Sequence, residues 1–302
     1  MSKILITGGT IFVSKYIAEH FVHRGDDVFV LNRNTHPQVH GVNLIQADKN
    51  TVCEQLKHHH FDLVIAVNIY TEKEMKNLLD GLSDIQDFIF ISSSAVYPET
   101  SPLPFRESLP VGHNAIWGDY GENKIKAENY LIQKVPEAYI LRPPYFYGKY
   151  QNLYREGFVF DCAVQKMPFY IPKDGKMKLQ FYNVRDLCRF IDTLMIQKPA
   201  QHIFNVGNKQ LIDINEFVQI CYDIVGTPLN PVYVDASHNQ RSYFPFYDYE
   251  YYLDVSEQYR LLPDTVSIYD GFKEDFEWYI YHRDDVMSKK TYFEYIEKVL
   301  KK

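Results

Sequence analysis

The stretch that decides the fold is KILITGGTIFVS, residues 3–14. Its first five residues form a short aliphatic run, which the paired glycines Gly8 and Gly9 end. The next segment repeats apolar residues at helical spacing, namely Val13, Tyr16, Ile17, Phe21 and Val22. The pattern predicts a buried strand, a glycine turn and a helix.

Further apolar runs continue this rhythm along the first half of the chain. They lie at 27–31, 43–46, 63–67, 87–91 and 138–141, with helical spacing at 52–58 and 117–133. Strands that alternate with helical segments predict a parallel sheet with right-handed crossovers. We therefore expect an α/β protein with a doubly wound sheet.

The composition changes after Arg142-Pro143-Pro144, where aromatic residues become dense. We expect residues 1–150 to bind a cofactor and residues 151–302 to form a smaller α+β substrate lobe, with about 184–206 returning to the first domain. Helices are predicted at 157–165, 184–196, 215–224, 271–281 and 290–300. For the tyrosine-rich segment 243–252 we favour a packed aromatic loop, while stacking on a sugar or base stays open.

Composition limits the function. The formal charge of −7 and the absence of a long Lys/Arg run argue against a nucleic-acid surface. No apolar stretch reaches about 18 residues and the start differs from a signal peptide, so a cytoplasmic protein without a membrane segment is expected. Cys53, Cys162, Cys188 and Cys221 form no CxxC pair, and we expect reduced, mostly buried thiols. Consecutive His58, His59 and His60 do not suit a metal, so none is expected; a homodimer stays open.

The glycine turn is a candidate phosphate site. At a strand-to-helix turn, free N–H groups and the positive helix end favour a pyrophosphate. The residues that would surround it are Thr7, Gly8, Gly9, Thr10, Ile11 and Phe12. The usual pattern has glycine in place of Ile11 and Ser14, so an ordinary tight turn is the alternative.

Selection of the cofactor is expected at the end of the second strand. An acidic residue there would pair with a ribose 2′-hydroxyl, but the chain has Asn32 followed by Arg33. A neutral Asn32 and a guanidinium favour NADP(H) over NAD(H), unless Arg33 is only a solvated loop residue. Asp48, after the third strand, is a candidate for the adenine amine or a helix N-cap.

Tyr120 and Lys124 are candidates for the chemistry. Residues four apart on a helix share a face, so the ammonium is expected near the phenol, where it would lower the pKa of Tyr120 and prepare a general base. Ser92, Ser93 and Ser94 end the 87–91 strand, at the edge of an open sheet where ligands bind. Alternatively, the three serines only terminate the strand. His113, in the loop before the 117–133 helix, is either a substrate contact or a solvated loop residue.

An ordered series of motifs resembles the extended short-chain dehydrogenase/reductase superfamily, the NAD-dependent epimerase/dehydratase group. Besides TGGT, SSSAVY and YGENK, the chain has LRPPYFYG at 141–148, NVRDL at 183–187, FNVG at 204–207 and LDVS at 253–256. The TGGTxF opening, with a non-glycine at Ile11, resembles an atypical subgroup, some of whose plant chloroplast members bind RNA.

The resemblance implies a Rossmann-type domain and a role for each matched residue. It implies Tyr120 as acid/base, Lys124 as its ribose-binding partner and Ser93 as the catalytic hydroxyl. Ser94 and Ala95 stand where sugar dehydratases keep an Asp-Glu pair, which disfavours dehydration. The remaining candidates are Ala66, Val67, Asn68 and Pro143 beside the cofactor, and Ser94, His113 and Tyr147 beside the substrate.

These expectations lead to one favoured function and two alternatives. The favoured one is an NAD(P)-dependent oxidoreductase or epimerase that acts on a hydroxyl or carbonyl of a sugar-like, nucleotide-linked small molecule. The alternatives are a non-catalytic nucleotide-binding or RNA-associated protein on the same fold, and an NADPH-dependent reductase of a small carbonyl compound.

Overall fold

The computed structural model describes residues 1–51 and 54–301; Cys53 and the first two residues of the predicted 52–58 helix lie outside this part. Its centre is a seven-stranded sheet with the order β11-β6-β5-β4-β1-β2-β3, in which every pairing is parallel. The strands are β1 (Lys3–Thr7), β2 (Asp27–Asn32), β3 (Asn43–Gln46), β4 (Leu63–Ala66), β5 (Asp87–Ile91), β6 (Tyr139–Arg142) and β11 (Ile203–Asn205). The predicted doubly wound sheet is confirmed.

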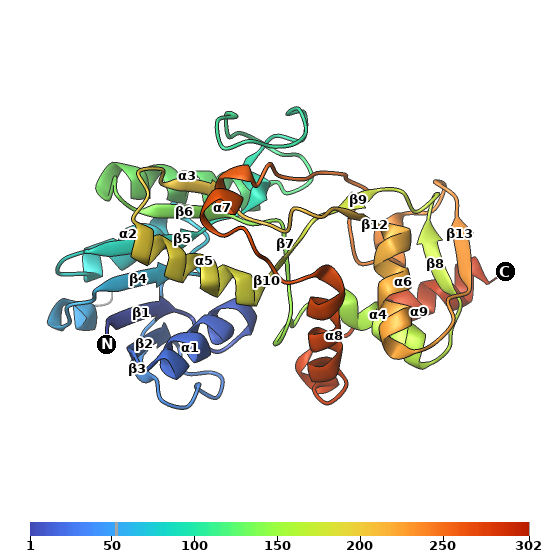
Figure 1. Cartoon of the computed structure of the whole chain (residues 1–302), viewed down its shortest axis with the longest axis horizontal. Helices are drawn as coiled ribbons and strands as arrows, with labels where there is room; N and C mark the ends of the chain where they lie inside the picture. The colour runs from blue at the N-terminus through green and yellow to red at the C-terminus, as the bar shows by residue number, and fades with distance from the viewer. Residues whose placement is uncertain (52–53, 302) are drawn as a thin grey trace.

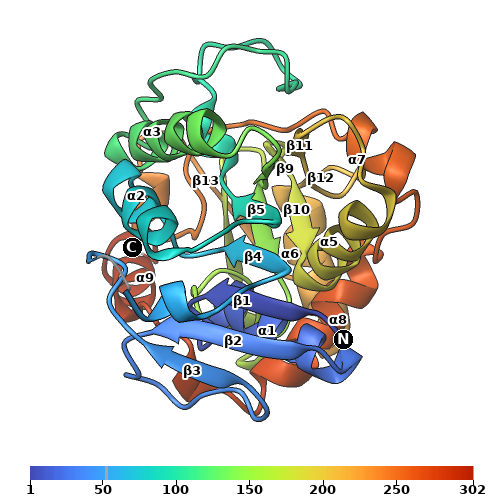
Figure 2. The same ribbon diagram turned by 90° about the vertical axis from the view of Figure 1, so that its left-hand side faces the viewer.

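Alternate residues of the strands feed two cores, one on each face of the sheet. Ile4 and Ile6 of β1 pack with α1 (Phe12–Arg24) and α5 (Val184–Gln197). Leu5 packs with α2 (Glu72–Gly81) and α3 (Asp119–Lys134) on the other face. Figure 2 shows α2 and α3 stacked together on one side of the sheet. The short helices η1 (Glu54–His58) and α7 (Ser256–Leu261) lie nearby.

The C-terminal half forms a second lobe with its own aromatic core, and the two chain ends lie at opposite ends of the molecule (Figure 1). Phe181, Phe217, Phe246 and Phe272 pack together in it with ring centroids 5.2–5.8 Å apart. Its helices are α4 (Glu156–Val164), α6 (Ile214–Val225), α8 (Ile268–Tyr279) and α9 (Lys290–Tyr295), which continues as η5 (Ile296–Leu300). Its strand pairs are β7 (Tyr145–Tyr147) with β10 (Phe181–Asn183), β9 (Lys178–Leu179) with β12 (Ile212–Asp213), and β8 (Phe169–Pro172) with β13 (Pro231–Val234).

Several elements differ from the sequence prediction. Helix α2 was not predicted, although Thr71 and Glu74 form a capping box at its start. The short strands of the second lobe were also missed, because two to four residues carry too little periodicity to identify a strand. Cys162, Cys188 and Cys221 are free and buried. Within residues 1–51 and 54–301, no helix is long and apolar enough to cross a membrane.

Candidate active site

Two cavities meet beneath the C-terminal ends of the sheet strands. The first, about 630 Å³, runs from the glycine turn past Asn32 and Arg33 to Tyr120 and Lys124. The second, about 400 Å³, extends into the C-terminal lobe. Four residues line both cavities, which are Ser93, Tyr120, Pro144 and Leu153. The structure thus brings two of the three predicted catalytic residues to the point where the cavities join.

The glycine turn has the backbone that the sequence predicts. Gly8 and Gly9 have φ values of +98° and +90°, which side chains disfavour. A Cβ on Gly9 would lie 2.4 Å from Val30 Cγ1, so this glycine serves packing beneath the turn. Ile11 is the N-cap of α1 but offers no side-chain cap, so the first N–H groups of the helix stay available to an anion.

Ser14 and Phe12 complete the turn. Ser14 is buried, and its hydroxyl donates to the Ile11 carbonyl at 2.9 Å. A Cβ on Gly8 would lie 2.8 Å from Ser14 Oγ, so the serine occupies the space that Gly8 leaves. Thr10, Ile11, Phe12 and Ser14 line the first cavity. The two residues that replace glycines of the usual pattern therefore form part of the groove wall over the turn.

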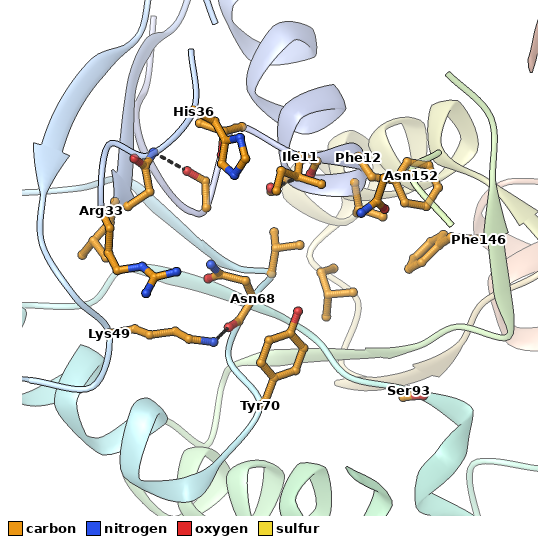
Figure 3. A pocket seen from close by; sticks show the side chains of 18 of the residues that line it. Ile11, Phe12, Arg33, His36, Lys49, Asn68, Tyr70, Ser93, Phe146 and Asn152 are labelled. Carbon is orange, nitrogen blue, oxygen red and sulfur yellow. Dashed lines mark hydrogen bonds between the residues drawn. The ribbon is translucent and has the colours of Figure 1, made fainter. Parts of the chain in front are cut away.

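The far end of the first cavity holds Asn32, Arg33 and Asp48. Asn32 donates through its amide to the Gly8 carbonyl at 2.7 Å, so its side chain is committed to the turn. Arg33 and His36 point into the cavity from the β2 side (Figure 3). Asp48 accepts from the backbone N–H and side-chain amide of Asn50, and these hydrogen bonds lower the pKa of its carboxyl. It thus stabilises a local turn while it faces the groove.

The β4 end contacts the same groove. Thr7 accepts through Oγ1 from the N–H groups of Val67 and Asn68 at 2.9 and 3.3 Å, which fixes the strand end; Ala66 is buried in β4. Among the described residues, the buried Asn68 Oδ1 has no hydrogen-bond partner. Since Val67, Asn68 and Pro143 line the groove, this free acceptor and the open start of α1 fit a dinucleotide.

Lys49 and Tyr70 also line the groove, and neither was predicted from the sequence. Lys49 Nζ donates to the Asn68 carbonyl, pairs with Glu74 at 3.1 Å and lies 4.1 Å from the Tyr70 ring centre. In Figure 3 the Tyr70 hydroxyl points into the middle of the cavity. Their positions after β3 and β4 were the available signal, because strand ends line this edge.

Tyr120 and Lys124 share a face of α3 but do not form the predicted pair. Lys124 Nζ donates to the carbonyls of Ile69 and Ile91 at 2.7 and 2.9 Å. Burial lowers the pKa of Lys124 to about 7 and raises that of Tyr120 to about 12. A side-chain hydrogen bond with Ser93 lowers the Tyr120 pKa, but its effect is smaller than that of burial. The predicted lowering of the Tyr120 pKa was wrong, because burial disfavours the phenolate and the Lys124 ammonium donates to two backbone carbonyls instead. Tyr120 as a whole residue is 41% exposed, so solvent reduces this rise in its pKa.

Helix α3 is fixed against the sheet by a buried ion pair. Arg142 of β6 donates to Glu128 through Nη2 at 2.6 Å and Nε at 3.1 Å, and its Nη1 donates to Tyr97 at 2.9 Å. Gly121 lets the helix approach, since a Cβ there would lie 2.4 Å from the Ala95 carbonyl oxygen. These contacts set where Tyr120 lies relative to Ser93.

The second cavity is aromatic and positively charged. Its charged side chains, among the described residues, are Arg155, Arg241 and Lys289, with no Asp or Glu. Its rings come from Trp117, Tyr120, Tyr145, Tyr154, Phe246, Tyr247, Tyr251 and Tyr292. Part of the tyrosine-rich segment 243–252 therefore lines the cavity, while Tyr243 and Phe244 pack in the core. A positive pocket in a chain of net charge −7 suits an anionic ligand.

The three predicted substrate residues lie in different places. Ser94 is buried and lines the second cavity. His113 is on the surface, where Nδ1 lies 2.7 Å from Glu122, and Tyr147 is buried against Phe272. In the described part of the chain, neither His113 nor Tyr147 lines either of these two cavities, because the loop carries one outward and β7 turns the other into the lobe core.

The chain matches the model of the NAD dependent epimerase/dehydratase family over residues 4–207 and belongs to that family. It is 24% identical over 300 residues to the chloroplast stem-loop binding protein of 41 kDa b of Arabidopsis thaliana, covering 91% of this chain and 76% of the relative. It is 26% identical over 310 residues to a putative UDP-glucose 4-epimerase of Methanocaldococcus jannaschii, covering 91% and 97%. The fold is similar to that of the UDP-glucose 4-epimerase of Thermotoga maritima solved with UDP-glucose, with a TM-score of 0.76, 20% identity and coverage of 92% and 99%.

Proposed function

We propose that the protein is an NAD(P)-dependent epimerase or dehydrogenase that acts on a hydroxyl group of an anionic, nucleotide-linked sugar. The observation that carries the proposal is that Ser93 and Tyr120 line both cavities. A cofactor in the first cavity and a substrate in the second would then meet at these two hydroxyl groups. Similarity to UDP-glucose 4-epimerases supports the substrate class.

Bound NAD(P) supplies a nicotinamide that accepts or returns hydride. Tyr120 moves the proton of the reacting substrate hydroxyl, and Ser93 hydrogen-bonds the same oxygen and holds its position. Lys124, which lines the groove and donates to two backbone carbonyls, would hold the cofactor ribose. Arg155, Arg241 and Lys289 bind the anionic part of the substrate.

The proposal includes a preference for NADP(H) over NAD(H) and no dehydratase activity. Arg33 and His36 line the end of the groove, and Asn32 adds no negative charge there, which favours NADP(H). Ser94 and Ala95 carry no acid/base pair for the removal of water, which disfavours dehydratase activity.

The test is Tyr120→Phe in the full-length protein, assayed with UDP-glucose and each cofactor. We expect turnover to fall by about 100-fold or more, since general acid–base catalysis contributes that much. Cofactor affinity should change little, because the ring stays in place. The control is Tyr130→Phe on the same helix, which should keep full turnover. Full activity in Tyr120→Phe would contradict the assignment.

A second candidate function is a non-catalytic, RNA-associated protein on the same fold, which the similarity to the Arabidopsis stem-loop binding protein favours. Titration with NAD(H) and NADP(H), followed by a stem-loop RNA, separates the two functions. Cofactor binding without RNA binding supports the enzyme. RNA binding without any cofactor binding supports the alternative.

A further inference from the structure

Arg155 forms part of the wall of the second cavity and has a buried neighbour behind it. Its guanidinium lies over the rings of Tyr145 and Phe246, 5.4 and 5.8 Å from their centres, and Nη2 donates to the Phe146 carbonyl. Its Nε is buried without a hydrogen-bond partner among the described residues and lies 3.9 Å from Glu156 Oε2. One end of Arg155 thus faces the ligand space while the other faces a carboxyl group.

Two carboxyl groups are enclosed at this place. Glu156 begins α4 and is 0% exposed, and Asp275 of α8 is 2% exposed. Gly157 lets the two helices approach, since a Cβ there would lie 2.8 Å from the ring of Tyr279, one turn after Asp275. Neither carboxyl oxygen of Glu156 has a hydrogen-bond partner among the described residues. Buried acids without such partners are costly to keep ionised.

The electrostatic surroundings favour a proton on this pair. Burial is the main cause that raises the pKa of both carboxyl groups, and the charge of Glu156 raises the pKa of Asp275 further. Arg155 is the positive group that faces both and acts in the opposite direction. Among the described residues, the other titratable neighbours are Cys221 of α6 and Tyr147 of β7, whose pKa values are raised by burial, so both are neutral near pH 7.

We propose that Glu156 and Asp275 are positioning residues that act through Arg155 and link binding of an anionic substrate to uptake of a proton from solvent. In the free protein the pair keeps negative charge opposite Arg155. When a substrate phosphate pairs with Arg155, the guanidinium compensates the buried carboxylate less, and the pair binds a further proton. The inference rests on the proposed function, because it needs an anionic ligand in the second cavity.

The linkage has a definite sign. If the bound state holds more protons than the free state, affinity falls as the pH rises through the titration of the pair. The effect reaches about tenfold in Kd per pH unit where one full proton is taken up. UDP-glucose is a suitable probe, because its diphosphate diester does not titrate in the neutral range.

The experiment is calorimetry of UDP-glucose binding to the cofactor-loaded Tyr120→Phe protein, from about pH 6 to about pH 9, in two buffers that differ in ionisation enthalpy. We expect uptake of up to about one proton per site and a Kd that rises with pH. Asp275→Asn and Glu156→Gln in the same background should lose most of the uptake and flatten the Kd profile. Both keep Lys124, so any titration of that amine remains in every variant.

Controls separate folding from linkage. Glu277→Gln removes an exposed acid from the same helix and should keep the full pH dependence. Measurements of cofactor affinity and thermal unfolding show whether each variant is folded. If the Asp275→Asn and Glu156→Gln proteins do not fold, Arg155→Gln tests the same linkage, because it removes the cation that lies between the ligand and the two carboxyl groups. UDP-glucose binding without proton uptake, or uptake unchanged in these variants, overturns the linkage alone. No binding by the parent protein overturns the linkage together with the proposed substrate class.

Discussion

The side-chain amide of Asn32 donates a hydrogen bond to the backbone carbonyl of Gly8 at 2.7 Å, which ties the end of β2 to the glycine turn. Its other contacts, to Gln38 and to the N–H of Asn34, also lie within the protein. Asn32, which the sequence marks as a candidate contact to the ribose, therefore holds the shape of the glycine turn. This relationship changes what a substitution there should do.

Asn32→Asp should weaken binding of both NAD(H) and NADP(H). The carboxylate keeps the acceptor for Asn34 but loses the donor to Gly8, and it places negative charge beside a carbonyl. We expect the unfolding free energy to fall by about 1–3 kcal/mol, measured by urea denaturation. Stronger NAD binding with unchanged stability would instead indicate a side chain free to face the ribose.

Arg33→Ala should weaken NADP(H) binding about tenfold and leave NAD(H) binding nearly unchanged. The guanidinium lines the cavity beside His36, and the loss of a charge-assisted contact to a phosphate costs about 1.5 kcal/mol. Fluorescence titration with both cofactors provides the measurement. An equal loss of affinity for NAD(H) and NADP(H) would show that Arg33 contacts a part of the molecule that the two cofactors share.

Lys124→Met should remove a pH dependence from stability. The folded pKa of Lys124 is about 7, below its ordinary value of 10.5. Between these values the unfolded chain binds a proton that the folded chain lacks, so stability rises with pH across this window. From about pH 7 to about pH 9, wild type should gain up to about 1.4 kcal/mol per pH unit relative to the variant. If the unfolding free energies of wild type and Lys124→Met changed equally with pH over that range, the low pKa of the buried Lys124 amine would be contradicted.

Gly121→Ala should reduce activity through a shift of α3. The new Cβ would lie 2.4 Å from the Ala95 carbonyl oxygen, so the helix must move away from Ala95, two residues after Ser93. We expect about 1–3 kcal/mol of destabilisation and a drop in kcat larger than the change in cofactor affinity. Lys126→Ala, on the exposed side of the same helix, is the matched control and should behave like wild type. A fully active Gly121→Ala protein would show that the helix tolerates the displacement.

Much of the first domain was predictable because its signals are local. The strands at 3–7, 43–46 and 87–91 match the structure at both ends. In the first and the third, the last four residues are all buried, and a buried apolar run of this kind has few alternatives to a strand. The positions of Gly8, Ser93 and Tyr120 along strand and helix ends then follow from the rule that ligands bind at the carboxyl edge of a parallel sheet.

What the sequence determined by itself was thus the α/β class, the glycine turn and part of the set of residues that face the groove, because strand and helix periodicity are properties of neighbouring residues. Tertiary structure alone decided that Lys124 turns to two carbonyls, that Tyr147 enters the core and that Arg155, Arg241 and Lys289 surround one cavity. It also buried both Glu156 and Asp275. These features depend on contacts between segments that are distant in the chain, where burial and pairing, rather than residue type, set the charge and orientation of each group.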